Sequence, residues 1–160
     1  MQFFSKEMIF LNKEFDSSKD LFSCVALRAK ELGYVRDGFL EALEKRESLY
    51  PTALPGTTCD IAVPHTDPEF IIKPFIAVVT CQKGVPFIQM GSDNLTIYPK
   101  IFFVLGFLRE GCELYQVKTL QLLIDFFITK ENGQKALEFL SNGEDKCLEE
   151  LEGLEQQLKK

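Results

Sequence analysis

Two near-continuous apolar runs decide the fold: Phe-Ile-Ala-Val-Val-Thr-Cys at residues 75–81 and Ile-Phe-Phe-Val-Leu-Gly-Phe-Leu at residues 101–108. Strands that are buried on both faces of a sheet have this composition, because helices cover each face. Neither run could span a bilayer as a helix, which takes about 20 apolar residues. We therefore expect both runs to form central strands of an α/β sheet.

Shorter strands and two helices are expected around these runs. Residues 8–11, 61–63 and 86–90 have the composition of brief strands, and Pro64 should end the second of them because proline cannot donate a ladder hydrogen bond. Ser17 and Ser18 can cap a helix that ends at Gly33, and a second helix is expected from Asp37 to about Glu47. Residues 50–60 contain two prolines and a glycine and are expected to form a loop.

After residue 111, apolar residues at helical spacing predict three further helices, at about 114–127, 136–140 and 148–158. The order of helices, strands and helices favours an α/β (α+β) fold with a mixed sheet of about five strands, covered by helices on both faces. No linker, repeat or shift in composition divides the chain, so residues 1–160 are expected to form a single domain.

The composition excludes several classes of function. The formal net charge is −6, the sequence pI is about 4.9, and no cluster of Lys and Arg is present that could bind nucleic acid. The chain has 5 cysteines, an odd number, and no Cys-x-x-Cys pair, so neither a disulfide framework nor a zinc site is expected. Residues 1–15 lack the apolar core of a signal peptide. These features predict a cytoplasmic protein with no direct membrane insertion.

His65 is the single histidine of the chain and lies just past a predicted strand end, in Ile-Ala-Val-Pro-His-Thr-Asp at residues 61–67. Open α/β sheets build their sites at such positions. A Ser-His-Asp hydrolase would need a nucleophile motif, and a metal site would need more ligands at regular spacing; the sequence contains neither. A neutral imidazole can attack an activated phosphoryl group. A loop histidine without function is the alternative.

The sequence motifs around His65 resemble those of a known protein family. Residues 44–47 read Glu-Lys-Arg-Glu, residues 50–54 read Tyr-Pro-Thr-Ala-Leu, and residues 61–67 follow as quoted. This order is similar to that of the enzyme IIA proteins of the sugar phosphotransferase system, of the fructose/mannitol/galactitol type. The resemblance continues through residues 73–78, 87–91 and 116–123, and covers about 8–150, the expected core of the domain.

The resemblance implies a phosphotransferase component that works through a phosphohistidine. His65 would accept a phosphoryl group from the phosphocarrier HPr and pass it to a cysteine of enzyme IIB, which serves the membrane component IIC. Arg46, at the family's Arg-Glu position, would stabilise the phosphoryl oxygens, since a guanidinium can bind two of them at once. No metal or organic cofactor is implied. The alternative is a regulatory module whose phosphorylation state controls a kinase, a transcription regulator or a transporter.

Several positions depart from the family pattern or leave alternatives open. Gln116 stands near the position of a second histidine in mannitol-type members, and with residues 90–93 it favours a galactitol-like branch. Ala53 replaces a common glycine, so the loop before His65 would be reshaped if that glycine serves a positive φ. Cys59 is expected to be a buried thiol rather than a redox group. Asp67 could orient the imidazole, as could Thr66 or a backbone carbonyl, or it could form a turn with the following proline.

Overall fold

The two apolar runs form the centre of the sheet, as predicted. In the computed structural model, β4 (Phe75–Thr80) and β7 (Ile101–Gly106) pair antiparallel along their whole length, from Phe75 opposite Gly106 to Thr80 opposite Ile101, and every residue of both strands is buried. The structure describes residues 2–56, 59–110, 112–123, 125–126, 138–139 and 141–158, except for the side chains of residues 112, 113, 115, 116, 120 and 158.

Within the described residues the main sheet has five strands in the order β1-β4-β7-β3-β2. β1 (Ile9–Phe10) is parallel to β4, and β3 (Ile61–Ala62) is parallel to β7. β2 (Ala53–Leu54) is antiparallel to β3, so the predicted mixed sheet is confirmed. A separate hairpin pairs β5 (Phe87–Ile88) with β6 (Thr96–Ile97).

Two of the short strands have no recognisable signal in the sequence. The segment 50–60, expected to be a loop, contains β2, and β6 was not predicted. A strand of two residues shows no alternation of apolar and polar side chains, because alternation needs about four residues to become visible. Both strands exist because a neighbouring strand supplies their hydrogen bonds.

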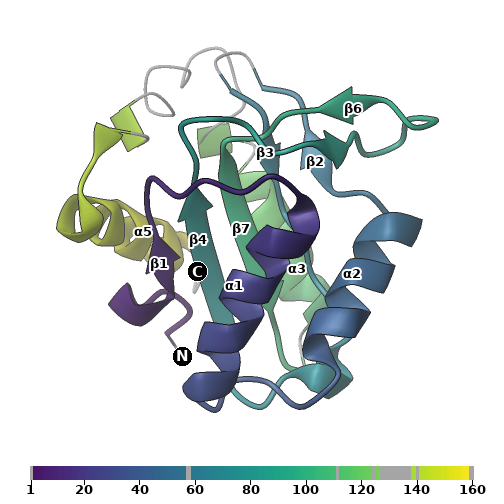
Figure 1. Ribbon diagram of the computed structural model, residues 1–160. Coiled ribbons are helices and arrows are strands. Elements are labelled where there is room, and N and C mark those ends of the chain that lie inside the picture. Colours follow the sequence, from purple (N-terminus) through teal and green to yellow (C-terminus); the bar gives the residue numbers. More distant parts are fainter. Residues whose placement is uncertain are drawn as a thin grey trace.

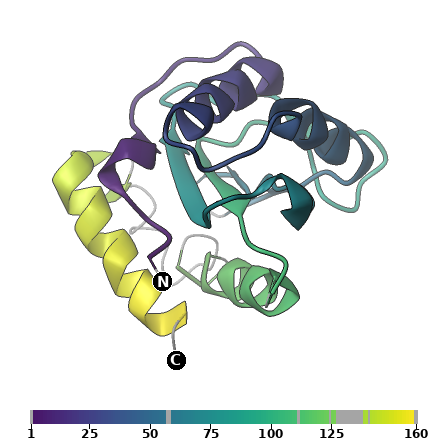
Figure 2. The same cartoon turned by 90° about the horizontal axis from the view of Figure 1, so that it is seen from below.

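Helices cover both faces of the sheet, as predicted (Figures 1 and 2). α1 (Ser18–Glu31) and α2 (Phe39–Leu49) lie on one face, and α3 (Cys112–Leu123) and α5 (Glu144–Leu158) lie on the other. Side chains alternate along β4 and β7, so each strand contributes to two separate cores. The core under α1 and α2 includes Ala77, Val79, Phe102 and Val104, and the core under α3 and α5 includes Ile76, Val78, Phe103 and Leu105.

The ends of the first two helices follow local signals. The Ser17 side chain accepts a hydrogen bond from the Asp20 backbone N–H at 3.3 Å, which caps α1 as predicted. Gly33 follows the helix with φ +75°, a value that favours glycine. α2 begins at Phe39, two residues later than predicted, because Gly38 takes the capping position with φ +93°.

Two short 3-10 helices, η1 (Lys6–Met8) and η2 (Pro68–Phe70), complete the described elements. The helix predicted at about 136–140 falls mostly outside the described residues, and only residues 138 and 139 are seen in helical conformation. In the part of the chain that the structure describes, no helix combines the length and the hydropathy that a membrane span requires.

Candidate active site

His65 lies directly beyond β3, against the far end of β7. The chain continues from Ala62 through the buried Val63 and Pro64, and the Leu105 N–H donates to the Pro64 carbonyl at 2.9 Å. His65 itself forms a parallel bridge with Leu105. The backbone of His65 is therefore held by the long central strand of the sheet, while its side chain is half-buried.

The imidazole is oriented by a backbone carbonyl. Nδ1 of His65 lies 2.9 Å from the Val63 carbonyl oxygen. A carbonyl oxygen can only accept, so Nδ1 carries the proton in this contact. In the neutral ring, Nε2 then holds the free lone pair, and it is the atom that can act as a nucleophile.

Burial keeps His65 in its neutral form. Desolvation lowers the pKa of His65 below its ordinary value of 6.5, and the positive charge of Arg46 lowers it further. The Val63 hydrogen bond and the negative charge of Asp67 act in the opposite direction and only partly offset the effect of burial. At neutral pH the ring is therefore available as a nucleophile.

Arg46 projects from α2 toward the same site. Its Nη1 donates to Oδ1 of Asp67 at 3.1 Å, and its guanidinium lies 4.9 Å from the centre of the Tyr50 ring. Its Nε is buried and has no hydrogen-bond partner among the described residues. Both side chains of the ion pair are well exposed, so the pair adds little to stability. It does hold the guanidinium at Asp67, two residues from His65, where the positive charge of Arg46 acts on the imidazole.

The remaining predicted site residues have different positions. The Asp67 carboxylate accepts from Arg46, whereas the imidazole donates to the Val63 carbonyl, so Asp67 reaches the ring through its charge and not through a hydrogen bond. The buried Thr66 hydroxyl donates to the Asp67 carbonyl at 3.0 Å. Gln116 lies on α3, but its side chain is not among those that the structure describes. Its role at the position of the family's second histidine therefore stays a prediction.

Ala53 and Cys59 have structural roles. Ala53 lies in β2 opposite Ala62, and among the described residues the non-glycine positive φ angles are at Asn12 and Asn94 only. Ala53 is therefore accommodated in a strand without a positive φ, and the reshaping of the loop relative to the family stays a prediction. Burial raises the pKa of the Cys59 thiol to about 11, so the buried side chain stays protonated, in agreement with a structural thiol.

Glu47 and Thr52 form a contact that the sequence analysis did not assign. The Glu47 Oε1 accepts from the Thr52 backbone N–H at 3.0 Å, and the Thr52 hydroxyl lies 3.0 Å and 2.9 Å from the two carboxyl oxygens. Thr52 is only 2% exposed. Both residues belong to the sequence motifs that carry the family resemblance, at residues 44–47 and 50–54. Their place in these motifs is the signal that could have identified them.

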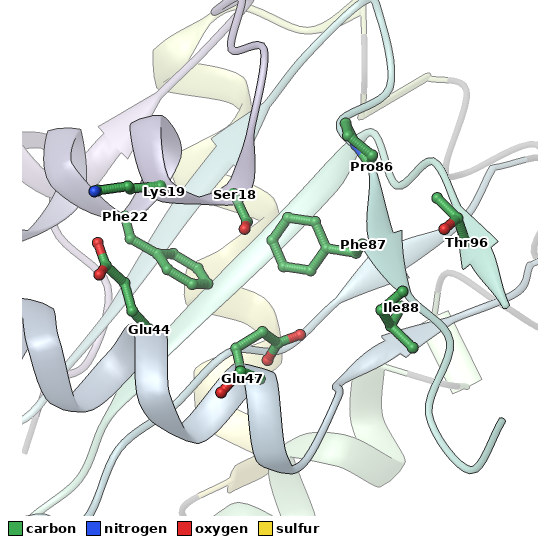
Figure 3. A pocket seen from close by; sticks show the side chains of 10 residues that line it. Ser18, Lys19, Phe22, Glu44, Glu47, Pro86, Phe87, Ile88 and Thr96 are labelled. Carbon is green, nitrogen blue, oxygen red and sulfur yellow. The ribbon is translucent and has the colours of Figure 1, made fainter. Parts of the chain in front are cut away.

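The Glu47 side chain also lines a cavity of about 290 Å³ (Figure 3). It opens between α1, α2 and the β5–β6 hairpin, and the rings of Phe22 and Phe87 form its apolar wall. The Glu44 and Glu47 side chains reach it from α2, and Lys19 reaches it from α1. The cavity is separate from the His65 site, since neither His65 nor Arg46 is among its lining residues.

The environment of Glu47 predicts a pH-dependent stability. Burial raises the pKa of Glu47 from 4.5 to about 7, although the hydrogen bonds from Thr52 act against this shift. Because the folded pKa is raised, the stabilisation is complete below the unfolded pKa and is lost as the pH rises through about 7. Glu47→Gln should therefore gain about 1–3 kcal/mol over the wild type between pH 5 and pH 8 in urea denaturation.

The control for this measurement is Glu41→Gln, which removes a carboxylate from an exposed position of the same helix. The difference between this variant and the wild type should stay constant over the same pH range. A constant difference for Glu47→Gln as well would contradict a buried, titrating carboxyl group at this position.

No group of three or more His, Cys, Asp or Glu side chains capable of holding a metal ion occurs within the described residues. The arrangement around His65 instead provides one imidazole nitrogen with a free lone pair and one guanidinium beside it. Such a pair can accept a phosphoryl group and stabilise its negative oxygens.

Comparison with solved structures gives the same fold. The chain aligns with the crystal structure of IIA mannitol from Escherichia coli at 25% identity and TM-score 0.55, over 75% of this chain and 82% of that one. It aligns with the Streptococcus mutans protein that carries the name PTS IIA (PtxA) at 18% identity and TM-score 0.67, over 96% and 90%. It also aligns with IIA in the complex of Escherichia coli enzyme IIA Mtl and phosphorylated enzyme IIB Mtl, at 20% identity and TM-score 0.61, over 86% and 96%.

The comparison with curated protein sequences returned no match. The family described as "Phosphoenolpyruvate-dependent sugar phosphotransferase system, EIIA 2" matches residues 2–151. This match contains every element of the sheet and the whole His65 site. Since it extends over nearly all of the 160 residues, the chain belongs to the EIIA 2 family of the phosphoenolpyruvate-dependent sugar phosphotransferase system.

Proposed function

We propose that this chain is a cytoplasmic phosphoryl carrier that accepts a phosphoryl group from phospho-HPr on Nε2 of His65 and passes it to a cysteine of enzyme IIB. The observation that carries the proposal is the contact between His65 Nδ1 and the Val63 carbonyl at 2.9 Å, which directs the lone pair to Nε2. Family membership supports the phosphotransferase role.

In the accepting step, the lone pair of Nε2 attacks phosphorus and forms a P–N bond. The bond from phosphorus to the donor atom of HPr breaks, and its electron pair stays on that donor. Nδ1 keeps its proton and donates it in the hydrogen bond to the Val63 carbonyl throughout. The Arg46 guanidinium stabilises the charge on the phosphoryl oxygens as it is transferred.

In the donating step, the thiolate of the enzyme IIB cysteine attacks phosphorus. A P–S bond forms, the P–Nε2 bond breaks, and the electron pair returns to Nε2 of His65. The Escherichia coli enzyme IIA Mtl, which has the same fold, is seen in a complex with phosphorylated enzyme IIB Mtl, and this supports the proposed acceptor. The thiols of Cys59, Cys81 and Cys147 do not compete, since burial raises their pKa values to about 11.

The two partners need an accessible surface near His65. α2 and α3 lie on opposite faces of the sheet, next to the β3–β7 pair that leads to His65 (Figures 1 and 2). Both helices carry exposed apolar side chains, which are Leu49, Leu114 and Val117, and Tyr50 follows directly after α2. Such side chains suit a weak interface that exchanges one partner for another. The galactitol-like branch remains our proposal for the place of this chain within the family, and it rests on Gln116 and residues 90–93.

The relay is tested with phosphorylated protein and a cognate enzyme IIB. Protein labelled through phosphoenolpyruvate, enzyme I and HPr should keep its label for minutes alone and lose it quickly when enzyme IIB is added, because a thiolate is a good nucleophile. The measurement is the label on each protein, separated after quenching.

The control is an enzyme IIB whose active cysteine is replaced by serine, which should leave the label on this chain. If no enzyme IIB of the same organism removes the label, while phosphorylation changes the binding of a regulator, the regulatory alternative replaces the proposed transport role.

A further inference from the structure

The contact between Glu47 and Thr52 closes the end of α2. The helix ends at Leu49, and the carboxyl group of Glu47 reaches past Tyr50 to the backbone N–H and hydroxyl of Thr52. Thr52 leads directly into Ala53 of β2, whose carbonyl accepts from the Met90 N–H at 2.8 Å. Glu47 therefore joins α2 to both β2 and the segment after β5.

The residues between Glu47 and Thr52 include a contact of the active site. Tyr50 leaves the helical conformation with φ −133° and ψ 81°, which places its ring 4.9 Å from the Arg46 guanidinium. Tyr50 is 62% exposed, so packing does not hold its ring in place. The backbone on its two sides does: the Tyr50 N–H donates to the Arg46 carbonyl at 2.8 Å, and two residues later Thr52 is bound by Glu47.

A carboxyl group at this place has an energetic cost that an apolar side chain would not have. Glu47 is held among Phe22, Phe87 and the Thr52 backbone, and Lys19 and Glu44 are the other titratable groups that line the same cavity. Neither of these two is a hydrogen-bond partner of Glu47; Glu44 Oε1 has no partner among the described residues. Among the described residues, the hydrogen-bond partner of the Glu47 side chain is Thr52.

We propose that Glu47 is a positioning residue for phosphoryl transfer: closed on Thr52, it holds Tyr50 against Arg46 and thereby keeps the guanidinium beside His65. This proposal rests on the proposed function of His65. The linkage runs from Glu47 through Thr52 and Tyr50 to Arg46, and from Arg46 through the 3.1 Å bond to Asp67, two residues from His65.

The first test is the pKa of His65, which does not require any phosphoryl transfer. His65 is the single histidine, so its ring signals can be followed by NMR titration without ambiguity. Arg46 lowers the pKa of His65, so Arg46→Ala should raise it, and Glu47→Ala should raise it in the same direction if the guanidinium moves away. A role in folding alone would leave the His65 titration unchanged in the folded variant.

Three further variants separate the effect of the Glu47–Thr52 contact from the effect of the Glu47 charge. Glu47→Gln loses the same charge but keeps a carbonyl for the Thr52 N–H and an amide that can donate to its hydroxyl, so it should titrate like the wild type. Thr52→Val keeps the shape and loses the hydroxyl, and it should show part of the effect. Glu44→Ala removes a carboxylate from the same helix and the same cavity and should have no effect.

The second test is the rate of phosphorylation by phospho-HPr in the same variants. Glu47→Ala should slow transfer roughly ten- to a hundredfold, because a small displacement of a group that stabilises the transition state has effects of this size. Glu47→Gln and Glu44→Ala should stay within about threefold of the wild type. Unfolding experiments establish that each variant is folded at the temperature used.

The proposal is overturned if Glu47→Ala is folded and leaves both the His65 pKa and the transfer rate unchanged, or if Glu47→Gln behaves like Glu47→Ala. The proposed function fails separately, when the wild-type protein accepts no phosphoryl group from phospho-HPr. In that case the His65 titration still decides whether Glu47 positions Arg46.

Discussion

His65→Asn should abolish phosphorylation of this chain completely. The wild-type protein, incubated with phosphoenolpyruvate, enzyme I and HPr, should gain one acid-labile phosphoryl group, as expected for a P–N bond. The loss should be complete because the chain contains no second histidine. The measurement is the intact mass of the protein before and after treatment with acid.

Asparagine is the preferred replacement because its amide nitrogen, like Nδ1, is bonded to Cγ and can still donate to the Val63 carbonyl. The variant should therefore remain folded, and a thermal unfolding curve checks this. His65→Ala serves as a second variant that lacks the hydrogen bond as well. A stoichiometric phosphoryl group on either folded variant would show that the acceptor lies elsewhere in the chain.

Arg46→Ala should slow the transfer from phospho-HPr roughly ten- to a thousandfold, since one charged donor is lost from the transition state. The stability of the variant should change by no more than about half a kcal/mol, because the ion pair with Asp67 is exposed. Arg46→Lys should restore only part of the rate, because an ammonium group cannot bind two oxygens in a fixed plane. Rapid-quench kinetics with labelled phospho-HPr measure these rates.

The matched control for Arg46 is Arg28→Ala. Arg28 also lies on a helix and pairs with a neighbouring carboxylate, Glu31, at 3.5 Å, but it belongs to α1 and does not contact the His65 site. Its removal should leave the transfer rate unchanged. An equal rate for the wild type and for Arg46→Ala would reduce Arg46 to a partner of Asp67 with no part in the transfer.

The pKa of Glu47 affects how the variants have to be compared. Because the pKa of Glu47 is about 7, the charge of this residue changes within the pH range in which such assays are usually run. Rates and stabilities of all variants therefore have to be compared at one pH. The pH dependence of Glu47→Gln separates the contribution of this carboxyl group from that of His65.

The linear sequence is enough to predict the centre of the sheet, the first two helices and the candidate nucleophile. The long runs at β4 and β7 are recognisable because strands covered on both faces contain apolar residues at every position. The start and end of α1 depend on Ser17 and Gly33, whose effects act within one turn of the chain. His65 was identified by the order of short motifs around it, which is also a property of the linear sequence.

The assembly of the site depends on contacts between residues that lie far apart in the sequence. The choice of Val63 rather than Asp67 as the partner of the imidazole, and of Asp67 as the partner of Arg46, depends on distances between side chains that local sequence does not encode. The same holds for β2 and β6, which are strands because a neighbour pairs with them, and for the contact of Glu47 with Thr52. A buried polar group takes whichever partner the packed chain brings within reach, and the packing of the whole fold sets that choice.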